Sequence, residues 1–397
     1  MFTRNSLLLA ILFSLFIYLE HFGLSLKLIS TITSLLVFIM IFQLSKKELF
    51  ASGFMISLLW FWWIGHSFIY YELTYLIPII LVGISLIYGS LFYLIGLFKN
   101  IYYKIIYIFT LSFVNPFNFN WFKLELPLID SYLGTSKIEF LIILIISGLF
   151  IQYRQKYTKK ITILYFSTIL ALYLFNLYNY KDIKPSPLLI YQNHTNIDQK
   201  IKWNKEYKEG IVLNNFKAIQ NAIDKNYDLI VFPETAFPLI LNHESNLLTQ
   251  LFEYSKKIPI VLGSLYEKEQ RLYNSTYIFK NNSLQIAHKV VLVPFGEAVP
   301  FPQKIKNWIN DTFYNGAQDY ITAATPTTFN IKGVNFRNAI CYEATTDKIF
   351  QDLDTNYMIT ISNNAWFTPS TQATLQKLLL KYYSNKYKVF IYSITNQ

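Results

Sequence analysis

Long apolar runs fill the chain as far as about residue 180, and shorter, alternating patterns follow them. An uninterrupted apolar run of about 18 or more residues predicts a membrane helix, because roughly 20 residues of helix are needed to cross the hydrocarbon layer. Glu20 and His21 weaken the first run, and the fifth and sixth runs are short. The runs predict a membrane domain over residues 1–180 with about seven transmembrane helices, at 6–24, 26–44, 50–71, 74–97, 101–114, 138–152 and 160–178.

The second half alternates between strand and helix patterns after a polar linker over residues 181–187. Apolar residues recur at helical spacing over 205–225 and 371–385, whereas short continuous or alternating runs predict strands. Asn281-Asn282 and Lys332-Gly333 are turn dipeptides within two predicted hairpins. Strands are predicted at 188–192, 228–232, 258–265, within 276–293, within 328–340 and at 357–362. Mixed strands with covering helices indicate an α/β layered domain over residues 188–397.

Lysine and arginine placement predicts how the membrane half is oriented, since cytoplasmic loops carry an excess of these residues. One set of loops holds nine of them and the opposite loops, up to residue 137, hold three. The richer side holds Arg4, Lys46, Lys47, Lys99, Lys104, Arg154, Lys156, Lys159 and Lys160, and the poorer side holds Lys27, Lys123 and Lys137. We therefore expect a cytoplasmic N-terminus, a retained first helix and, after seven crossings, a second half outside the cytoplasm.

The loop over residues 115–137 is the longest between the predicted spans, and it contains Phe117, Phe119, Trp121 and Phe122. Aromatic rings of this kind settle at the headgroup level of a bilayer. Two interpretations stay open: an ordinary loop of the membrane belt, or a lipid-facing gate beside an active site.

Composition excludes several classes of function. The net charge of +11 comes with lysines in short loops between apolar spans and with no basic stretch interleaved with aromatics, so nucleic acid is not an expected partner. One cysteine permits no internal disulfide. No metal-ligand cluster, G-x-S-x-G elbow, P-loop or G-x-G-x-x-G motif occurs, so no metal and no cofactor are predicted.

Polar residues gather where the predicted strands end, which is where an α/β domain places its active site. Glu234 follows DLIVFP, Lys289 ends a hairpin strand, Cys341 ends FRNAI, and Asn363 and Asn364 follow MITIS. A nucleophilic thiol needs a nearby base or a lowered pKa. Glu234 is a candidate base, while Lys289 and the Tyr342 backbone N–H are candidate oxyanion donors. Each residue alone has an ordinary alternative as a small buried thiol, a solvated lysine or a turn carboxylate.

The strings that carry these residues resemble the nitrilase, or carbon-nitrogen hydrolase, superfamily. They are VFPETAFP around Glu234, HKVVLVPFGEAVPF from His288, NAICYEA around Cys341, and ISNNAWF. Combined with a multi-span membrane half, and with Gln192-Asn193 and Lys202-Trp203, they resemble the apolipoprotein N-acyltransferase family. The resemblance implies an α-β-β-α sandwich after the membrane helices and a Glu234–Lys289–Cys341 triad. It also implies supporting roles for Glu297, Glu343 and Tyr342 and, from the LYNS string, Asn274.

The resemblance further implies a reaction and its partners. Cys341 would take an acyl group from a phospholipid, typically phosphatidylethanolamine, as a thioester. The α-amine of a diacylglyceryl-cysteine on an apolipoprotein would then accept that group. The enzyme would lie in a bacterial inner membrane, with its catalytic domain on the periplasmic side.

Two departures and two alternatives accompany this prediction. TQATLQ, residues 371–376, lacks the histidine that follows AWF in the family, and the chain ends at Gln397, where the family continues, which predicts a C-terminally truncated form. One alternative is a membrane-tethered nitrilase-like amidase, whose acyl-enzyme reacts with water. The other is a non-enzymatic lipid transporter, which would not need Cys341.

Overall fold

The computed structural model describes residues 2–179, 182–313, 316 and 319–397. The chain forms two compact units, and the main division between them falls after Asp182. Unit 1 comprises Met1–Pro116, Asn120–Asp182 and Ser370–Tyr382, and unit 2 comprises Phe117–Phe119, Ile183–Pro369 and Tyr383–Gln397. Residues 117–119 therefore belong to unit 2 and residues 370–382 to unit 1, although the predicted domain ranges place each segment in the other half. The predicted linker begins at Lys181, which lies outside the described residues.

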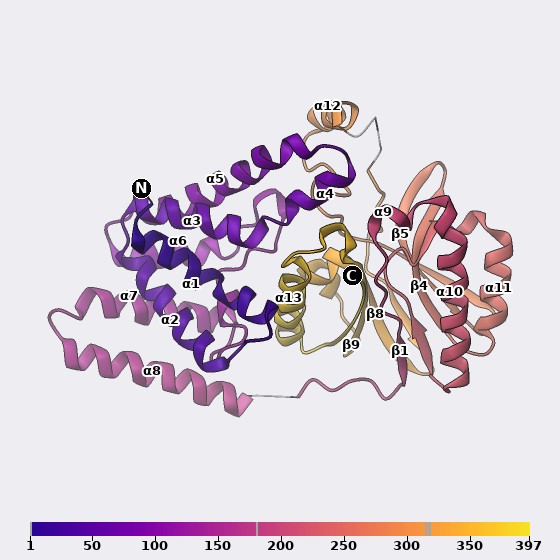
Figure 1. Ribbon diagram of the computed structural model, residues 1–397. Coiled ribbons are helices and arrows are strands. Elements are labelled where there is room, and N and C mark those ends of the chain that lie inside the picture. Colours follow the sequence, from indigo (N-terminus) through magenta and orange to yellow (C-terminus); the bar gives the residue numbers. More distant parts are fainter. Residues whose placement is uncertain (1, 180–181, 314–315, 317–318) are drawn as a thin grey trace. The chain divides into compact units, whose positions relative to one another are not determined.

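Unit 1 is helical (Figure 1). Two of its helices begin with a capping box, at Ser45 and at Ser136. In each box the serine side chain accepts a hydrogen bond from the backbone N–H of the glutamate three residues later, and that glutamate side chain accepts one from the serine backbone N–H. Within the described residues up to 179, the helices of four or more residues are α1 (Arg4–His21), α2 (Lys27–Gln43), α3 (Lys46–Phe61), α4 (Ile64–Tyr70), α5 (Ile77–Ile95), α6 (Ile101–Leu111), α7 (Lys137–Tyr153) and α8 (Thr158–Asn179).

Each predicted apolar run coincides with a helix or, for residues 50–71, with the bent pair α3 and α4. Among the described residues, three helices are long and apolar enough to cross a membrane: α1, Thr74–Ile95 and α8. The count rises to four if α3 and α4, which meet at 49°, form one span. Helix α6 has 11 residues, about half the length of a full crossing. Seven crossings therefore stay a prediction.

Aromatic rings fill the core of unit 1. Trp60 lies 5.8 Å from Phe13 and 5.0 Å from Phe122 between ring centroids. Trp121 and Phe122 are buried in the protein, so the expectation that these two rings lie among lipid headgroups is wrong. Their burial reflects packing against other aromatic side chains of the unit. Phe117, in contrast, is 42% exposed.

Unit 2 contains two stacked sheets. The first has six strands in the order β1-β2-β4-β5-β6, with β3 paired to β4, and the second has the order β10-β9-β8-β7. The strands are β1 (Ile190–Gln192), β2 (Leu229–Val231), β3 (Phe237–Ile240), β4 (Ile260–Lys268), β5 (Arg271–Lys280), β6 (Ser283–His288), β7 (Thr328–Ile331), β8 (Val334–Ile340), β9 (Tyr357–Asn363) and β10 (Phe390–Asn396). Both predicted hairpin turns are confirmed, at Asn281-Asn282 and at Lys332-Gly333.

Apolar side chains explain why the two sheets stack. Val231 and Val261 of the first sheet and Ile340 and Ile361 of the second belong to one buried cluster. Their neighbours along β2 and β4, such as Ile230 and Ile260, point to the opposite face and pack against helices. Burial on both faces accounts for the continuous apolar run of β2.

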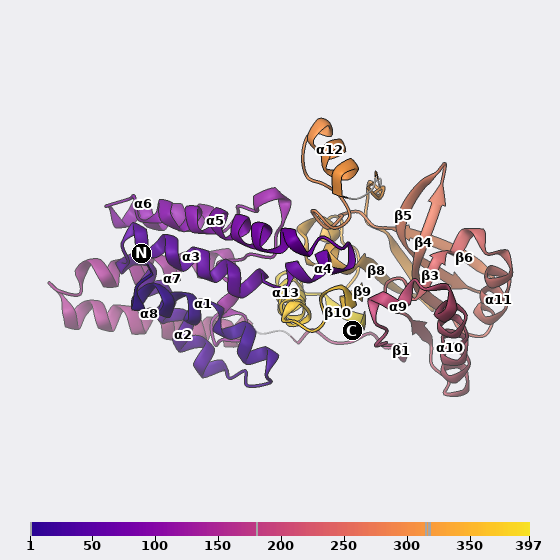
Figure 2. The ribbon, with the colours of Figure 1, turned by 45° about the horizontal axis from the view of Figure 1, so that its top comes forward.

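Two helices cover the outer face of the six-stranded sheet, α10 (Lys205–Asp224) and α11 (Ser245–Ser255) (Figure 2). Helix α10 has nearly the bounds predicted from its periodicity, whereas α11, β3 and β10 were not predicted. The other α-helices in the described part of the chain after residue 179 are α9 (Gln199–Lys202), α12 (Gln303–Phe313) and α13 (Gln372–Tyr387). Short 3-10 turns follow the ends of β8 and β9 at Cys341–Thr345 and Asn364–Phe367.

Candidate active site

The sheet ends bring the predicted residues to one place. Glu234 follows β2, Lys289 follows β6, and Cys341 follows β8. Lys289 is fully buried and Glu234 is 7% exposed. The Lys289 Nζ lies 3.9 Å from the Glu234 Oε1. Electrostatic coupling of Cys341 to both Glu234 and Lys289 places the thiol in the same cluster of charges.

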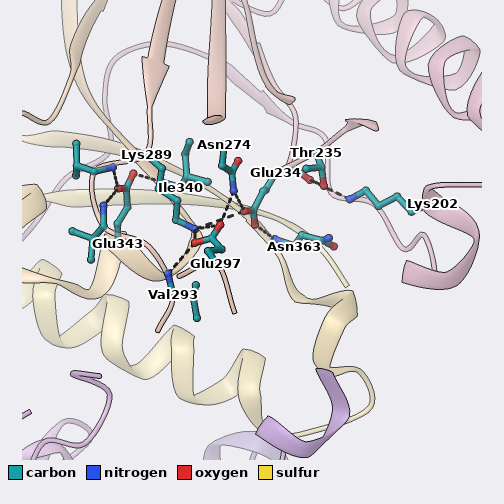
Figure 3. A network of polar contacts seen from close by, with 12 residues as sticks. Lys202, Glu234, Thr235, Asn274, Lys289, Val293, Glu297, Ile340, Glu343 and Asn363 are labelled. Atoms are coloured by element: carbon teal, nitrogen blue, oxygen red, sulfur yellow. Dashed lines mark hydrogen bonds and ion pairs between the residues drawn. The ribbon is translucent and has the colours of Figure 1, made fainter. Parts of the chain in front are cut away.

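Glu234 is held by hydrogen bonds from two elements, as Figure 3 shows. The side-chain amide of Asn274, on β5, donates to its Oε1 at 2.7 Å. The backbone N–H of Asn363, the last residue of β9, donates to its Oε2 at 2.8 Å. The carboxylate is therefore fixed in position as an acceptor.

Glu297 forms the second carboxylate of the site. Its Oε2 lies 2.7 Å from the Lys289 Nζ, and its Oε1 accepts from the Asn274 amide at 3.0 Å. The backbone N–H of Val293 also donates to Oε2, at 2.9 Å. Asn274 thus bridges the two carboxylates, and Lys289 contacts both of them.

Glu343 lies on the other side of the network in Figure 3 and binds backbone rather than side chains. Its Oε2 accepts from the N–H groups of Val290 and Val291 at 2.6 and 3.1 Å. Its Oε1 accepts from the Ile340 N–H at 2.8 Å. Glu343 therefore joins the segment after Lys289 to the segment before Cys341.

Backbone geometry at two of these positions is unusual. Cys341 has φ 55° and Thr235, next to Glu234, has φ 49°, in the left-handed region that residues with side chains seldom occupy. Such conformations cluster at active sites because the surrounding structure has to maintain them. At Cys341 the chain leaves β8 and enters a 3-10 turn.

The buried charges shift the ionisation of the site. Burial raises the pKa of the Cys341 thiol, and the Glu234 carboxylate adds to that effect, while Lys289 opposes it. Burial alone would lower the pKa of Lys289, but Glu297 and Glu234 outweigh it and raise the pKa, so the amine stays charged. Burial also raises the pKa of Glu234, against the charge of Lys289. The resting state thus pairs a neutral thiol with a charged lysine.

Tyr342, which the sequence predicts to be a supporting residue, follows Cys341 in the chain and lies close to its thiol. Its backbone N–H forms a hydrogen bond that lowers the pKa of Cys341, as expected for a group that faces the sulfur. Its ring stacks on Phe119 at a centroid distance of 5.8 Å, and its hydroxyl donates to the Asn118 carbonyl. Among the described residues, no group of three or more His, Cys, Asp or Glu side chains is arranged to hold a metal ion.

Three polar residues to which the sequence motifs give no catalytic role contact this network. Lys202 donates from its Nζ to the Glu234 carbonyl at 3.1 Å. Gln199 accepts from the Asn363 side chain, and Asn396 donates to the Asn363 Oδ1, both at 2.8 Å. Burial of these polar side chains was the missing signal, since the sequence alone does not show that Lys202 is 1% exposed.

Comparison with known proteins agrees with this arrangement. Residues 1–172 match the sequence model of the "Apolipoprotein N-acyltransferase integral membrane domain", and residues 196–396 match that of "Carbon-nitrogen hydrolase". The chain is 42% identical to the apolipoprotein N-acyltransferase of Wolinella succinogenes, over 98% of this chain and 92% of that protein. It is 34% identical to the enzyme of the same name from Helicobacter pylori, over 99% and 94% respectively.

Solved structures also show similarity. A CN-hydrolase superfamily protein from Xanthomonas campestris is 14% identical, with a TM-score of 0.40, over 53% of this chain and 76% of that one. An amidase from a Nesterenkonia species is 10% identical, with a TM-score of 0.38, over 55% and 80%.

Proposed function

Because the chain belongs to the apolipoprotein N-acyltransferase family, we propose that it transfers a fatty acyl group from a phospholipid to the N-terminal amine of a diacylated lipoprotein. One observation supports the site in particular. The single cysteine stands at a strained strand end, within a buried group of charges that contains a lysine and two carboxylates. The membrane helices of unit 1 keep the enzyme in the same plane as both lipid substrates.

In the first step Glu234 acts as a general base. The thiol is neutral at rest because its pKa is raised, so it must lose its proton as it attacks. Glu234 accepts that proton, helped by its own raised pKa, which makes it a stronger base. Cys341 Sγ bonds to the ester carbonyl carbon, and the protonated Glu234 then gives the proton to the departing alkoxide of the lysophospholipid.

Lys289 and the Tyr342 backbone N–H stabilise the oxyanion of each tetrahedral intermediate. Lys289 suits this role because its raised pKa keeps the ammonium charged. Loss of a single oxyanion donor typically lowers kcat about 100- to 1,000-fold. Glu297 acts on Lys289 at 2.7 Å, fixing the direction in which the ammonium points.

In the second step the lipoprotein amine attacks the thioester carbon. Glu234 accepts a proton from the attacking nitrogen, the carbon–sulfur bond breaks, and the thiolate takes the proton back from Glu234. The products are an amide on the lipoprotein and a free Cys341 thiol. We propose phosphatidylethanolamine as the acyl donor, as the family resemblance implies.

Acyl transfer is tested with the protein in vesicles that contain phosphatidylethanolamine with an isotope-labelled acyl chain. Intact-protein mass spectrometry should show one acyl adduct that neutral hydroxylamine removes, which identifies a thioester on Cys341 because the chain has one cysteine. A diacylated lipopeptide should then discharge the adduct and become triacylated. Discharge by water alone would instead identify a hydrolase and refute the proposal.

Variants assign the roles within that assay. Cys341→Ala should give no adduct, and Glu234→Gln should slow acylation by at least about 100-fold, as expected for loss of a general base. Glu253→Gln is the matched control, since that exposed carboxylate in the same unit pairs with Lys256, three residues further along the chain. Normal transfer by Cys341→Ala would exclude the thioester mechanism.

We also propose that unit 2 lies on the periplasmic side of the inner membrane, from the unequal lysine and arginine content of the loops. In a Cys341→Ala background, Lys225→Cys and Lys47→Cys place single exposed thiols in unit 2 and in unit 1. In spheroplasts, a membrane-impermeant maleimide should label Lys225→Cys and should spare Lys47→Cys until the membrane is broken. The reverse pattern would overturn the orientation.

A further inference from the structure

Lys202 is a buried amine for which the proposed mechanism has no use. It is the last residue of α9, and its side chain is 1% exposed. Its Nζ donates to the backbone carbonyl of Glu234 at 3.1 Å, as Figure 3 shows. Burying an ammonium is costly unless charges or hydrogen bonds compensate it, so a buried lysine on a functional loop calls for an explanation.

The same helical turn also reaches the carboxylate of Glu234. Gln199, the first residue of α9, accepts from the Asn363 side chain at 2.8 Å. The backbone N–H of Asn363 in turn donates to the Glu234 Oε2 at 2.8 Å. Helix α9 therefore contacts the base at its backbone directly and at its carboxylate through Asn363.

The charges around Glu234 come from several elements. Lys289 after β6 and Lys202 on α9 are the cations, and Glu297 is the neighbouring carboxylate, while Asn274 on β5 is a neutral donor and Cys341 after β8 is the thiol. On the far side of Lys289, burial raises the pKa of Glu343 and the charge of Lys289 opposes that shift. Since Lys289 is shared by Glu234 and Glu297, the charge of Lys202 is an additional one that acts on Glu234.

We propose that Lys202 is a positioning residue for acyl transfer, which holds the Glu234 turn through its carbonyl and favours the carboxylate form of the base by its charge. The inference rests on the proposed role of Glu234. Burial lowers the pKa of Lys202 to about 8, against the opposing effect of Glu234, so the amine is largely protonated near neutral pH. Its carbonyl contact lies one residue before Thr235, whose positive φ needs such restraint.

The test follows the alkylation of Cys341 by iodoacetamide from pH 5 to 9 in the full-length protein in vesicles, a reaction that needs no lipid transfer. The alkylation rate should fall at low pH as Glu234 becomes protonated, and this falling part of the pH profile is its acidic limb. Lys202→Gln keeps a donor but removes the charge, so the pKa of Glu234 should rise. The acidic limb should move upward by about half to one pH unit, with alkylation about 3- to 10-fold slower below it. Lys202→Met is a second neutral variant. The test uses whichever of the two Lys202 variants keeps the thermal midpoint of the wild-type protein, because that variant is folded.

Two comparisons isolate the effect. Lys200→Met removes an exposed charge from the same helix and should leave the limb unchanged. In a Glu234→Gln background the limb should be lost, and Lys202→Gln should add no further shift. If the limb depends on Glu234 but stays in place in the folded Lys202 variants, the positioning role is wrong while the proposed function stands. If Glu234→Gln has no effect on the limb, both the base role and this inference fail.

Discussion

Gly263 offers a way to displace Glu234, the proposed base, without changing its carboxylate. This glycine lies on β4, and a Cβ built on it would come within 2.7 Å of the Glu234 Cα and the Thr235 N and 2.8 Å of the Pro233 carbonyl. All three atoms belong to the backbone, so no side-chain rotation relieves the contact. Gly263→Ala must therefore push the Glu234 turn away from the strand.

The size of the displacement follows from those contacts. To restore an ordinary separation, the turn has to move by at least about 0.7 Å, a distance of the order that costs about 100-fold in rate when reacting groups are misplaced. Overpacking of this kind also costs about 1–3 kcal/mol of stability. We expect Gly263→Ala to fold and to acylate Cys341 some 10- to 100-fold more slowly.

Single-turnover acylation by labelled phospholipid, followed by mass spectrometry, measures this rate directly. Gly210→Ala is the matched control, because no atom lies within 4 Å of the added Cβ and the position is helical. That control should acylate normally and gain up to about 1 kcal/mol of stability from better helix propensity. Acylation of Gly263→Ala at the wild-type rate would show that the placement of Glu234 does not limit the reaction.

Substitutions at three further positions probe the rest of the network. Glu343→Gln replaces one accepting oxygen by an amide donor, so at least one of the Val290, Val291 and Ile340 N–H groups loses its partner. The thermal midpoint should fall by the equivalent of about 1–3 kcal/mol, and an unchanged midpoint would contradict this account. Asn274→Asp puts a third carboxylate against Glu234 and Glu297, and we expect it to slow Cys341 acylation at least about 100-fold. Asn274→Ala should be less impaired because it adds no charge, and equal rates for the two variants would exclude charge repulsion as the cause. Lys289→Met should slow acylation about 100- to 1,000-fold while the protein still reacts with iodoacetamide, and wild-type acylation would remove Lys289 from the oxyanion role.

The local sequence pattern predicted a strand or a turn correctly where a single physical cause determined that element. The continuous run at 228–232 predicts a strand buried on both faces, and β2 is such a strand because apolar clusters lie on both sides of it. Turn dipeptides placed both hairpins because Asn282 and Gly333 adopt positive φ. The run at 276–293, in contrast, does not stay in the sheet beyond His288, since the N–H groups of Val290 and Val291 bind Glu343 instead. That partner lies some 50 residues away and leaves no local signal.

The sequence indicates which residues gather at the candidate site, but not which hydrogen bonds connect them. Motif position placed Glu234, Lys289 and Cys341 at strand ends, and the strands bring them together. Nothing in the sequence indicated that Asn274 joins two carboxylates or that Lys202 binds the Glu234 carbonyl. A lysine within a short polar helix is normally solvated, and only the three-dimensional packing shows that this one is buried.

The three backbone contacts of Glu343 have a mechanical consequence for catalysis. They fasten the two residues just after Lys289 to the residue just before Cys341. Because one buried carboxylate binds both segments, a displacement of either segment strains these hydrogen bonds, which favours a constant spacing between the Lys289 ammonium and the Cys341 sulfur. In the proposed mechanism, where two lipid substrates enter one after the other, this link would keep the line of attack on each acyl carbon constant.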